Sequence, residues 1–169
     1  DAQHEIVTEL KSGLATAYKE LRELISAFRL KIDERGFQTA LRETTEEFAH
    51  RCNINIQCQN DLSPTLLSAN EEIHVLRIIR EALANIEKHA GANKVLIDAN
   101  ATDDNHVHIL ISDNGVGIGD AKSPENHYGL IIMEDRAQSL GGKITIRNGH
   151  AGGTEVLLSF VPEKSQSEI

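Results

Sequence analysis

The segment Ser112–Gly119 combines an acidic side chain with three glycines at alternate positions. Glycines let a backbone approach a ligand without a Cβ clash and leave its N–H groups free. The carboxylate of Asp113, at the end of an expected strand, can accept hydrogen bonds. These features suit ligand binding, although a flexible turn closed by an Asx hydrogen bond would have the same pattern.

Glycines mark two further segments of this kind. In His127–Leu130, Gly129 is expected to begin a helix, and the free N–H groups of a helix N-terminus bind phosphate well. Gly152–Thr154 is expected at a hairpin, where an ordinary glycine-rich β-turn is the alternative interpretation.

A stripe of polar residues lies on the helix that is expected to begin at an Asn70 cap and end at Gly91. The stripe consists of Glu81, Asn85, Lys88 and His89. Their spacings of 4, 3 and 1 place them almost opposite the apolar face of the helix. A solvated surface is the ordinary interpretation. Asn is a weak helix former, however, and Ile78 and Ala82 lie beside the stripe, so we expect another part of the protein to cover it.

The elements that must position these residues predict an α+β fold. Helices are expected, from apolar residues at helical spacing, over Phe37–Cys52, Asn70–Ala90 and roughly Gly129–Leu140. Strands are expected, from alternating apolar residues, over Ile54–Cys58, Val95–Ala99, Val107–Ser112, Lys143–Arg147 and Glu155–Val161. This order fits a two-layer sandwich of a mixed, mostly antiparallel sheet with helices on one face.

A long helix is expected before this domain. Its apolar residues recur at spacings typical of a coiled-coil or bundle seam: Leu10, Leu14, Ala17, Leu21, Leu24 and Phe28. Packing of this helix on the globular domain is the alternative. We expect a bundle helix at residues 1–33, a globular domain at 34–162 after a hinge, and a disordered tail at 163–169.

Composition excludes several functions. The 169 residues include 17 basic and 26 acidic side chains, a net charge of −9, which disfavours binding to nucleic acid or to an anionic membrane surface. No apolar run approaches the roughly 20 residues that span a bilayer. Cys52 and Cys58 are expected to be free thiols, and the eight scattered histidines do not indicate a metalloenzyme.

The order of the motifs resembles the ATP-binding domain of sensor histidine kinases, in the ATPase group shared with gyrases and heat-shock chaperones. Four segments look like the N, G1, G2 and G3 boxes of that family: residues 80–90, 112–119, 127–130 and 152–154. The resemblance spans Ile73–Val161. The segments Leu21–Leu30 and Ile131–Ala137 are similar to the nitrate/nitrite sensor kinases of bacterial two-component systems.

The resemblance implies that the domain binds ATP with Mg²⁺. Asn85 would hold Mg²⁺ on the phosphates, and Lys88 and His89 would contact phosphate oxygens. A metal and these side chains would set a local field that an acidic chain otherwise lacks. Asp113 would accept a hydrogen bond from the adenine amino group, and Thr154 would support that carboxylate or its bridging water.

The glycine boxes would supply backbone contacts. Gly115 and Gly117 would let the loop pass close to the base. Gly129 and Leu130 would offer N–H groups to the phosphates, and the preceding pair, His127–Tyr128, would belong to a mobile lid.

The implied reaction transfers the γ-phosphoryl group of ATP to a histidine, from which a response regulator receives it on an aspartate. Such a transfer depends on positioning and charge neutralisation. Glu81, the acid of the N box, would act as a base or as a structural carboxylate near Mg²⁺ or Arg80, and both interpretations stay open.

The phosphoaccepting histidine is expected to lie outside this sequence. The family places it on the first helix of a dimeric hairpin, whereas Leu21–Leu30 resembles the second helix. His4–Glu5 imitates the acceptor pair, but no hairpin turn separates it from the second-helix motif. We therefore expect a cytoplasmic catalytic fragment of a dimeric bacterial inner-membrane kinase that binds ATP but does not phosphorylate itself efficiently.

Two other functions are alternatives. A serine kinase of the anti-sigma type or an ATPase could use the same fold, but the coiled segment leading directly into the domain favours the histidine kinase. A non-catalytic dimerisation module would need no intact site, and the presence of Asn85, Asp113, Gly117 and Gly129 argues against it.

Overall fold

The computed structural model describes residues 13–14, 16–17, 20, 36–118 and 124–166. The chain divides into two units, residues 1–34 and 35–169, and the fold below is that of the second unit. The described residues of the first unit are helical, but most of the expected seam lies outside them. The bundle helix and the domain boundaries therefore stay predictions. No helix within the described ranges is long and apolar enough to cross a membrane.

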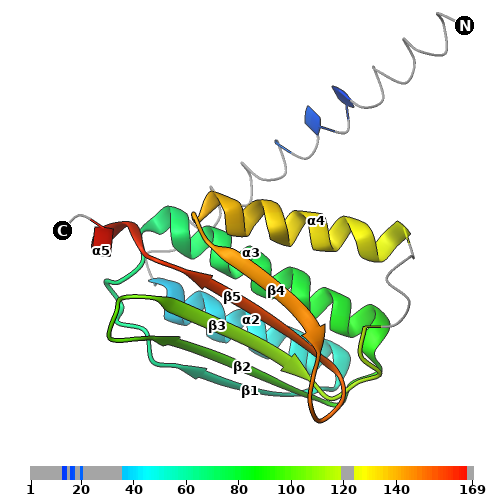
Figure 1. The fold of residues 1–169 in the computed structure, drawn as a ribbon. Coiled ribbons are helices and arrows are strands. Elements are labelled where there is room, and N and C mark those ends of the chain that lie inside the picture. The colour runs from blue at the N-terminus through cyan, green and yellow to red at the C-terminus, as the bar shows by residue number, and fades with distance from the viewer. Residues whose placement is uncertain (1–12, 15, 18–19, 21–35, 119–123, 167–169) are drawn as a thin grey trace, which may run out of the picture. The chain divides into compact units, whose positions relative to one another are not determined.

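A five-stranded mixed sheet forms one layer of the second unit (Figure 1), with strand order β1-β2-β3-β5-β4. Its strands are β1 (Asn55–Asn60), β2 (Lys94–Ala101), β3 (Val107–Asp113), β4 (Lys143–Asn148) and β5 (Thr154–Phe160). β1 pairs with β2 in parallel and the other neighbours are antiparallel. The strand predictions are confirmed within about two residues, a usual uncertainty for element ends.

Helices form the second layer, on one face of this sheet (Figure 1). They are α2 (Gly36–Cys52), α3 (Ala69–Asn85), the π-helix η1 (Ile86–Ala90), α4 (Pro124–Ser139) and, after the last strand, the short α5 (Glu163–Gln166). The core lies between the layers, where Ile97, Ile109 and Leu158 of the sheet and Ile78 and Ile79 of α3 are fully buried. The predicted α+β sandwich is therefore confirmed.

The N-terminus of α3 differs from the prediction, because Ser68 and not Asn70 is its cap. The Glu71 backbone N–H donates to Ser68 Oγ at 3.3 Å, and the Ser68 N–H donates to Glu71 Oε2 at 2.7 Å. This reciprocal capping box satisfies two helix-end donors at once, which a cap at Asn70 would not. The other end of the segment, at Gly91, is as predicted, with a left-handed φ of 57°.

The C-terminal residues return to this cap. The buried Glu71 also accepts a hydrogen bond from the Glu163 N–H at 2.8 Å, and Lys164 Nζ donates to the Thr65 carbonyl oxygen at 2.7 Å. Four residues of the expected disordered tail therefore form α5, and two of them are hydrogen-bonded to residues at and just before the start of α3.

Two further expectations need correction. Helix α4 begins at Pro124, five residues before Gly129, because proline is well suited to the first turn of a helix. In β1, the expected burial alternation fails at Cys58, which is exposed because β1 is an edge strand. Both Cys52 and Cys58 are free thiols, as predicted.

Candidate functional site: a cavity between helices and sheet

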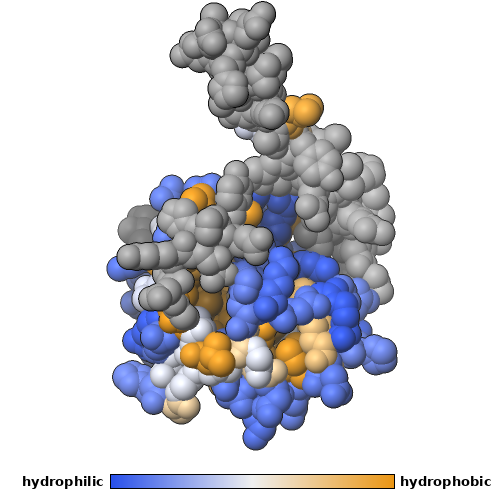
Figure 2. All heavy atoms as spheres, turned by 90° about the vertical axis from the view of Figure 1, so that its right-hand side faces the viewer, coloured by the Kyte–Doolittle hydropathy of each residue, from blue (hydrophilic) through white to orange (hydrophobic). Residues whose placement is uncertain are grey.

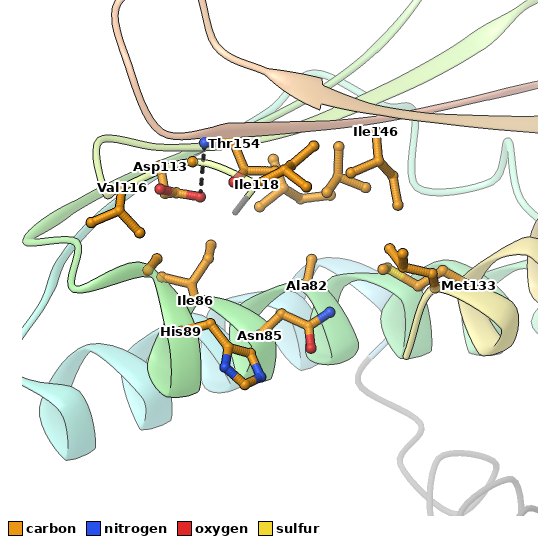
Figure 3. A pocket seen from close by; sticks show the side chains of 15 residues that line it. Ala82, Asn85, Ile86, His89, Asp113, Val116, Ile118, Met133, Ile146 and Thr154 are labelled. Carbon is orange, nitrogen blue, oxygen red and sulfur yellow. Dashed lines mark hydrogen bonds between the residues drawn. The ribbon is translucent and has the colours of Figure 1, made fainter. Parts of the chain in front are cut away.

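A cavity of about 470 Å³ lies between the helix layer and the sheet (Figure 3). Its walls come from α3, η1, β3, the loop after β3, α4, β4 and β5. Among the described residues, polar side chains line it at four positions: Asn85, His89, Asp113 and Thr154. A mostly apolar cavity with a few placed polar groups is typical of small-molecule sites.

Asp113 is the buried polar group on the sheet side of this cavity (Figure 3), with 5% of its surface exposed. Its Oδ1 accepts a hydrogen bond from the Gly115 N–H at 2.7 Å, and its Oδ2 accepts one from the Thr154 N–H at 3.2 Å. A carboxylate can accept about four hydrogen bonds, so acceptor capacity remains for a ligand. The orientation of Asp113 is thus fixed by two backbone donors.

The loop after β3 packs against other segments through its glycines. A Cβ on Gly115 would overlap the Ala90 carbonyl oxygen, which accepts a hydrogen bond from the Val116 N–H at 2.9 Å. Gly117 has a φ of 83°, and its Cβ would lie 2.6 Å from Asn148 Oδ1. These glycines are therefore required by contacts within the protein, in addition to any approach to a ligand.

Asn148, at the end of β4, was missed in the sequence. Its Oδ1 accepts a hydrogen bond from the Ile118 N–H at 2.7 Å and so holds the part of the loop after β3 that lines the cavity. Its only signal was an Asn–Gly pair after a strand, which also marks ordinary turns.

The polar stripe divides in the structure. The half-buried Asn85 and the exposed His89 line the cavity, whereas Lys88, which is also exposed, is not part of the lining. Glu81 lies beside α4, where a Cβ on Gly129 would come within 2.5 Å of its Oε1. The structure therefore brings Asn85 and His89 to the same cavity as Asp113 and confirms that something covers part of this face.

The G2 segment, residues 127–130, lies inside a helix and not at its expected beginning. Gly129 and Leu130 are inside α4, so their N–H groups are not those of a helix N-terminus. Gly129 instead allows α4 to pack closely on Glu81 and Asn85 of α3, and Leu130 lines the cavity. The side chains of His127–Tyr128 lie outside the described residues. The prediction that a helix begins at Gly129 is therefore wrong, whereas the contacts of Gly129 and Leu130 with phosphates stay a prediction.

Apolar side chains form most of the described cavity wall, and apart from Leu130 none of them was assigned to the site from the sequence. They include Ile86, Ile111, Val116, Ile118, Met133, Ile146 and Val156. Figure 2 views the end of the sheet at which β3 stops and shows hydrophobic atoms at the surface between hydrophilic ones. Val116 is 80% exposed in the loop that follows β3. Strand alternation identified Ile111 as buried, but it does not distinguish core from cavity wall.

Comparison with known proteins agrees with this geometry. Residues 70–165 match the family model of histidine kinase-, DNA gyrase B- and HSP90-like ATPases. The match covers more than half of the chain, and the chain belongs to this family. The predicted fold family, the ATPase domain that histidine kinases share with gyrases and heat-shock chaperones, is thereby confirmed.

Two of the relatives are nitrate/nitrite sensor proteins. The chain is 37% identical over 169 residues to the nitrate/nitrite sensor protein NarX of Escherichia coli, covering 100% of this chain and 28% of NarX. It is 40% identical over 156 residues to the nitrate/nitrite sensor protein NarQ of the same species, covering 92% of this chain and 27% of NarQ. The chain thus spans little more than a quarter of these relatives.

Solved structures share the fold. The blue-light activated histidine kinase of Erythrobacter litoralis matches with a TM-score of 0.69 and 17% identity, covering 94% of this chain and 52% of that one. The ATP binding domain of PrrB from Mycobacterium tuberculosis matches with a TM-score of 0.57 and 23% identity, over 73% of this chain and 92% of that one.

Proposed function

We propose that this chain is the catalytic part of a nitrate/nitrite sensor kinase that transfers the γ-phosphoryl group of ATP to a histidine for relay to a response regulator. The observation that carries the proposal is the cavity that holds Asp113 on the sheet side and Asn85 and His89 on the helix side. Asp113 would bind the adenine amino group, and Asn85 and His89 would lie toward the phosphates.

The residues around Asn85 fit a magnesium ion held jointly with phosphates. Mg²⁺ prefers oxygen ligands and often uses only one or two protein groups besides substrate phosphates. Among the described residues no group of three or more His, Cys, Asp or Glu side chains could hold a metal by itself. The Asn85 side chain lines the cavity, where its amide oxygen would serve as a ligand. When bound, the metal would neutralise phosphate charge during transfer.

The chain's own groups would then orient the nucleotide. Asp113 presents a fixed acceptor because Gly115 and Thr154 hold its carboxylate. The apolar wall, including Ile111 and Met133, would cover the faces of the base and exclude water. Glu81 lies next to Asn85 and Gly129. At this position its carboxylate would act either as a base or as a structural group near the metal.

Other features of the whole protein are also proposals. By its resemblance to NarX and NarQ, this part would act in the cytoplasm, in a dimer joined to the membrane by segments outside this sequence. Its acceptor histidine would lie on a helix that is likewise outside the sequence.

Phosphotransfer to a separate acceptor tests the proposed function. The chain is mixed with labelled ATP, Mg²⁺ and a hairpin that carries the acceptor helix of a nitrate sensor kinase. Label on the hairpin that is lost in acid and retained in base supports a histidine kinase. Acid-stable phosphoserine would favour the anti-sigma alternative, and no label on any protein would contradict kinase activity.

A further inference from the structure

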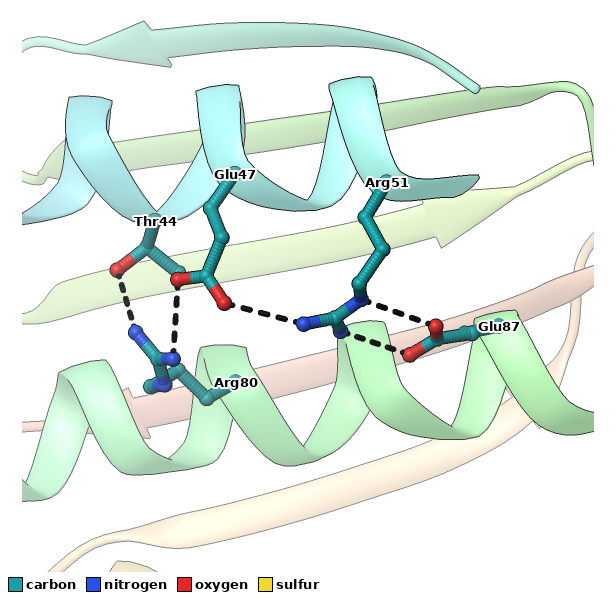
Figure 4. Close-up of polar contacts among 5 residues, drawn as sticks. All are labelled: Thr44, Glu47, Arg51, Arg80 and Glu87. Carbon is teal, nitrogen blue, oxygen red and sulfur yellow. Dashed lines mark hydrogen bonds and ion pairs between the residues drawn. The ribbon is translucent and has the colours of Figure 1, made fainter. Parts of the chain in front are cut away.

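Arg51, near the end of α2, forms a bidentate ion pair with Glu87 of η1 (Figure 4). Its Nε donates to Glu87 Oε1 at 3.1 Å, and its Nη2 donates to Oε2 at 2.8 Å. This hydrogen bonding raises the pKa of Arg51 and lowers the pKa of Glu87 from their ordinary values. Both groups are therefore charged at neutral pH. Because the two residues lie 36 positions apart in the sequence, the pair connects α2 with η1.

The pair belongs to a network along α2 (Figure 4). Arg51 Nη1 donates to Glu47 Oε1 at 3.0 Å, and Arg80 Nη2 of α3 donates to Glu47 Oε2 at 3.1 Å. Arg80 Nη1 also donates to Thr44 Oγ1 at 3.2 Å. The Arg51 guanidinium lies 4.3 Å from the centre of the Phe48 ring. Bidentate, networked pairs maintain a geometry better than isolated surface pairs.

Glu87 lies midway in sequence between Asn85 and His89, the two residues of this segment that would lie toward the phosphates. Side chains two positions apart on a helix point to nearly opposite sides. The ion pair therefore holds the side of this helical turn that faces away from the cavity, and the opposite side forms part of the cavity wall. That turn is a π-helix, a rare conformation that occurs frequently at functional sites.

We propose that Arg51 is a positioning residue for the phosphate side of the nucleotide cavity. It holds η1 so that Asn85 and His89 face the cavity, and it balances a carboxylate that would otherwise add negative charge near the phosphates. This inference rests on the proposed function. Arg51 does not line the cavity and lies outside residues 70–165, so the family match does not account for it.

Binding of MgATP and of adenosine separates this role from a structural one. Replacing Arg51→Gln is expected to weaken MgATP binding about fivefold, the upper range for a surface ion pair, and to leave adenosine binding unchanged. The matched control is Arg42→Gln. Arg42 is also on α2 and pairs with Glu46 at 3.3 Å, but both side chains are more than 60% exposed on the same helix. This control is expected to change neither affinity.

A charge exchange provides the second variant. Arg51→Glu alone is expected to lower MgATP affinity further than Arg51→Gln, and adding Glu87→Arg is expected to restore it, because the pair re-forms in reverse. Titration calorimetry gives both affinities, and thermal melting reports stability. Equal losses for MgATP and adenosine, no loss, or failure of the exchange would overturn the inference. A wild-type chain that binds adenosine but not MgATP would instead overturn the proposed function.

Discussion

A Cβ on Gly153 would overlap the backbone carbonyl oxygen of Asp113, the last residue of β3. Gly153 also has a φ of 74°, which strains residues with side chains. β5 can begin beside Asp113 only because residue 153 is glycine. This approach brings the Thr154 N–H to the Asp113 carboxylate.

The first prediction tests this contact. Gly153→Ala is expected to destabilise the fold by about 2 kcal/mol or more, because it adds overlap to backbone strain. Gly152→Ala is the control, since Gly152 has a φ of 94° but open space around its Cβ position. Urea denaturation should give a smaller loss for the control. Equal losses would show that strain alone matters.

Asp113→Asn tests recognition of the base. The new amide would present N–H groups toward a backbone donor or toward the ligand, so nucleotide affinity is expected to fall more than about tenfold, or 1.4 kcal/mol. Asp98→Asn, on β2 and away from the cavity lining, is the control. Unchanged affinity in a folded Asp113→Asn variant would remove this residue from the site.

Asn85→Ala tests the proposed magnesium ligand. ATP binding is expected to lose its enhancement by Mg²⁺, by about tenfold or more, while adenosine binding stays the same. Asn100→Ala, on β2, is the control because Asn100 is not in the cavity wall. Calorimetric titrations with and without Mg²⁺ measure the effect. A magnesium dependence retained in full would exclude this role of Asn85.

Glu71 is expected to be the acidic residue on which stability depends most directly. Glu71→Ala would leave the Ser68 and Glu163 N–H groups without their carboxylate acceptor, at a cost of about 2–4 kcal/mol. Glu71→Gln should cost less because one acceptor oxygen remains. Chemical denaturation of both variants, with the exposed Glu46→Ala for comparison, measures these differences. A loss no larger than that of Glu46→Ala would contradict the structural role.

Glu72 gives a pH-dependent prediction. Burial raises its pKa, so the charged form destabilises the folded state at neutral pH. This cost is absent below the ordinary pKa and reaches its full value as pH rises above the raised pKa. Glu72→Gln should therefore increase the melting temperature at pH 7 and have little effect near pH 4. Glu134→Gln, at an exposed position of α4, should not show this pattern.

Local sequence patterns were sufficient for most elements, because alternation and helical spacing reflect burial on one face. They failed where a residue is required by a contact with a segment distant in the sequence. Gly129 looked like a helix boundary, but its lack of a side chain serves the contact of α4 with Glu81. The motif order indicated that Asn85 and Asp113 share a site, whereas Asn148 could not be found because its partner, Ile118, is 30 residues away.

The cavity interrupts the contact between the two layers, so its wall residues belong to the hydrophobic core as much as to a binding site. Ile111 and Met133 are each 1% exposed. A nucleotide base bound in the cavity would pack against these core side chains and so add to the buried contacts between the two layers. Folding stability and ligand concentration are then coupled, and a ligand at 100 times its Kd adds about 2.7 kcal/mol to the free energy of unfolding. The stability of this domain would thus vary with the nucleotide supply around it.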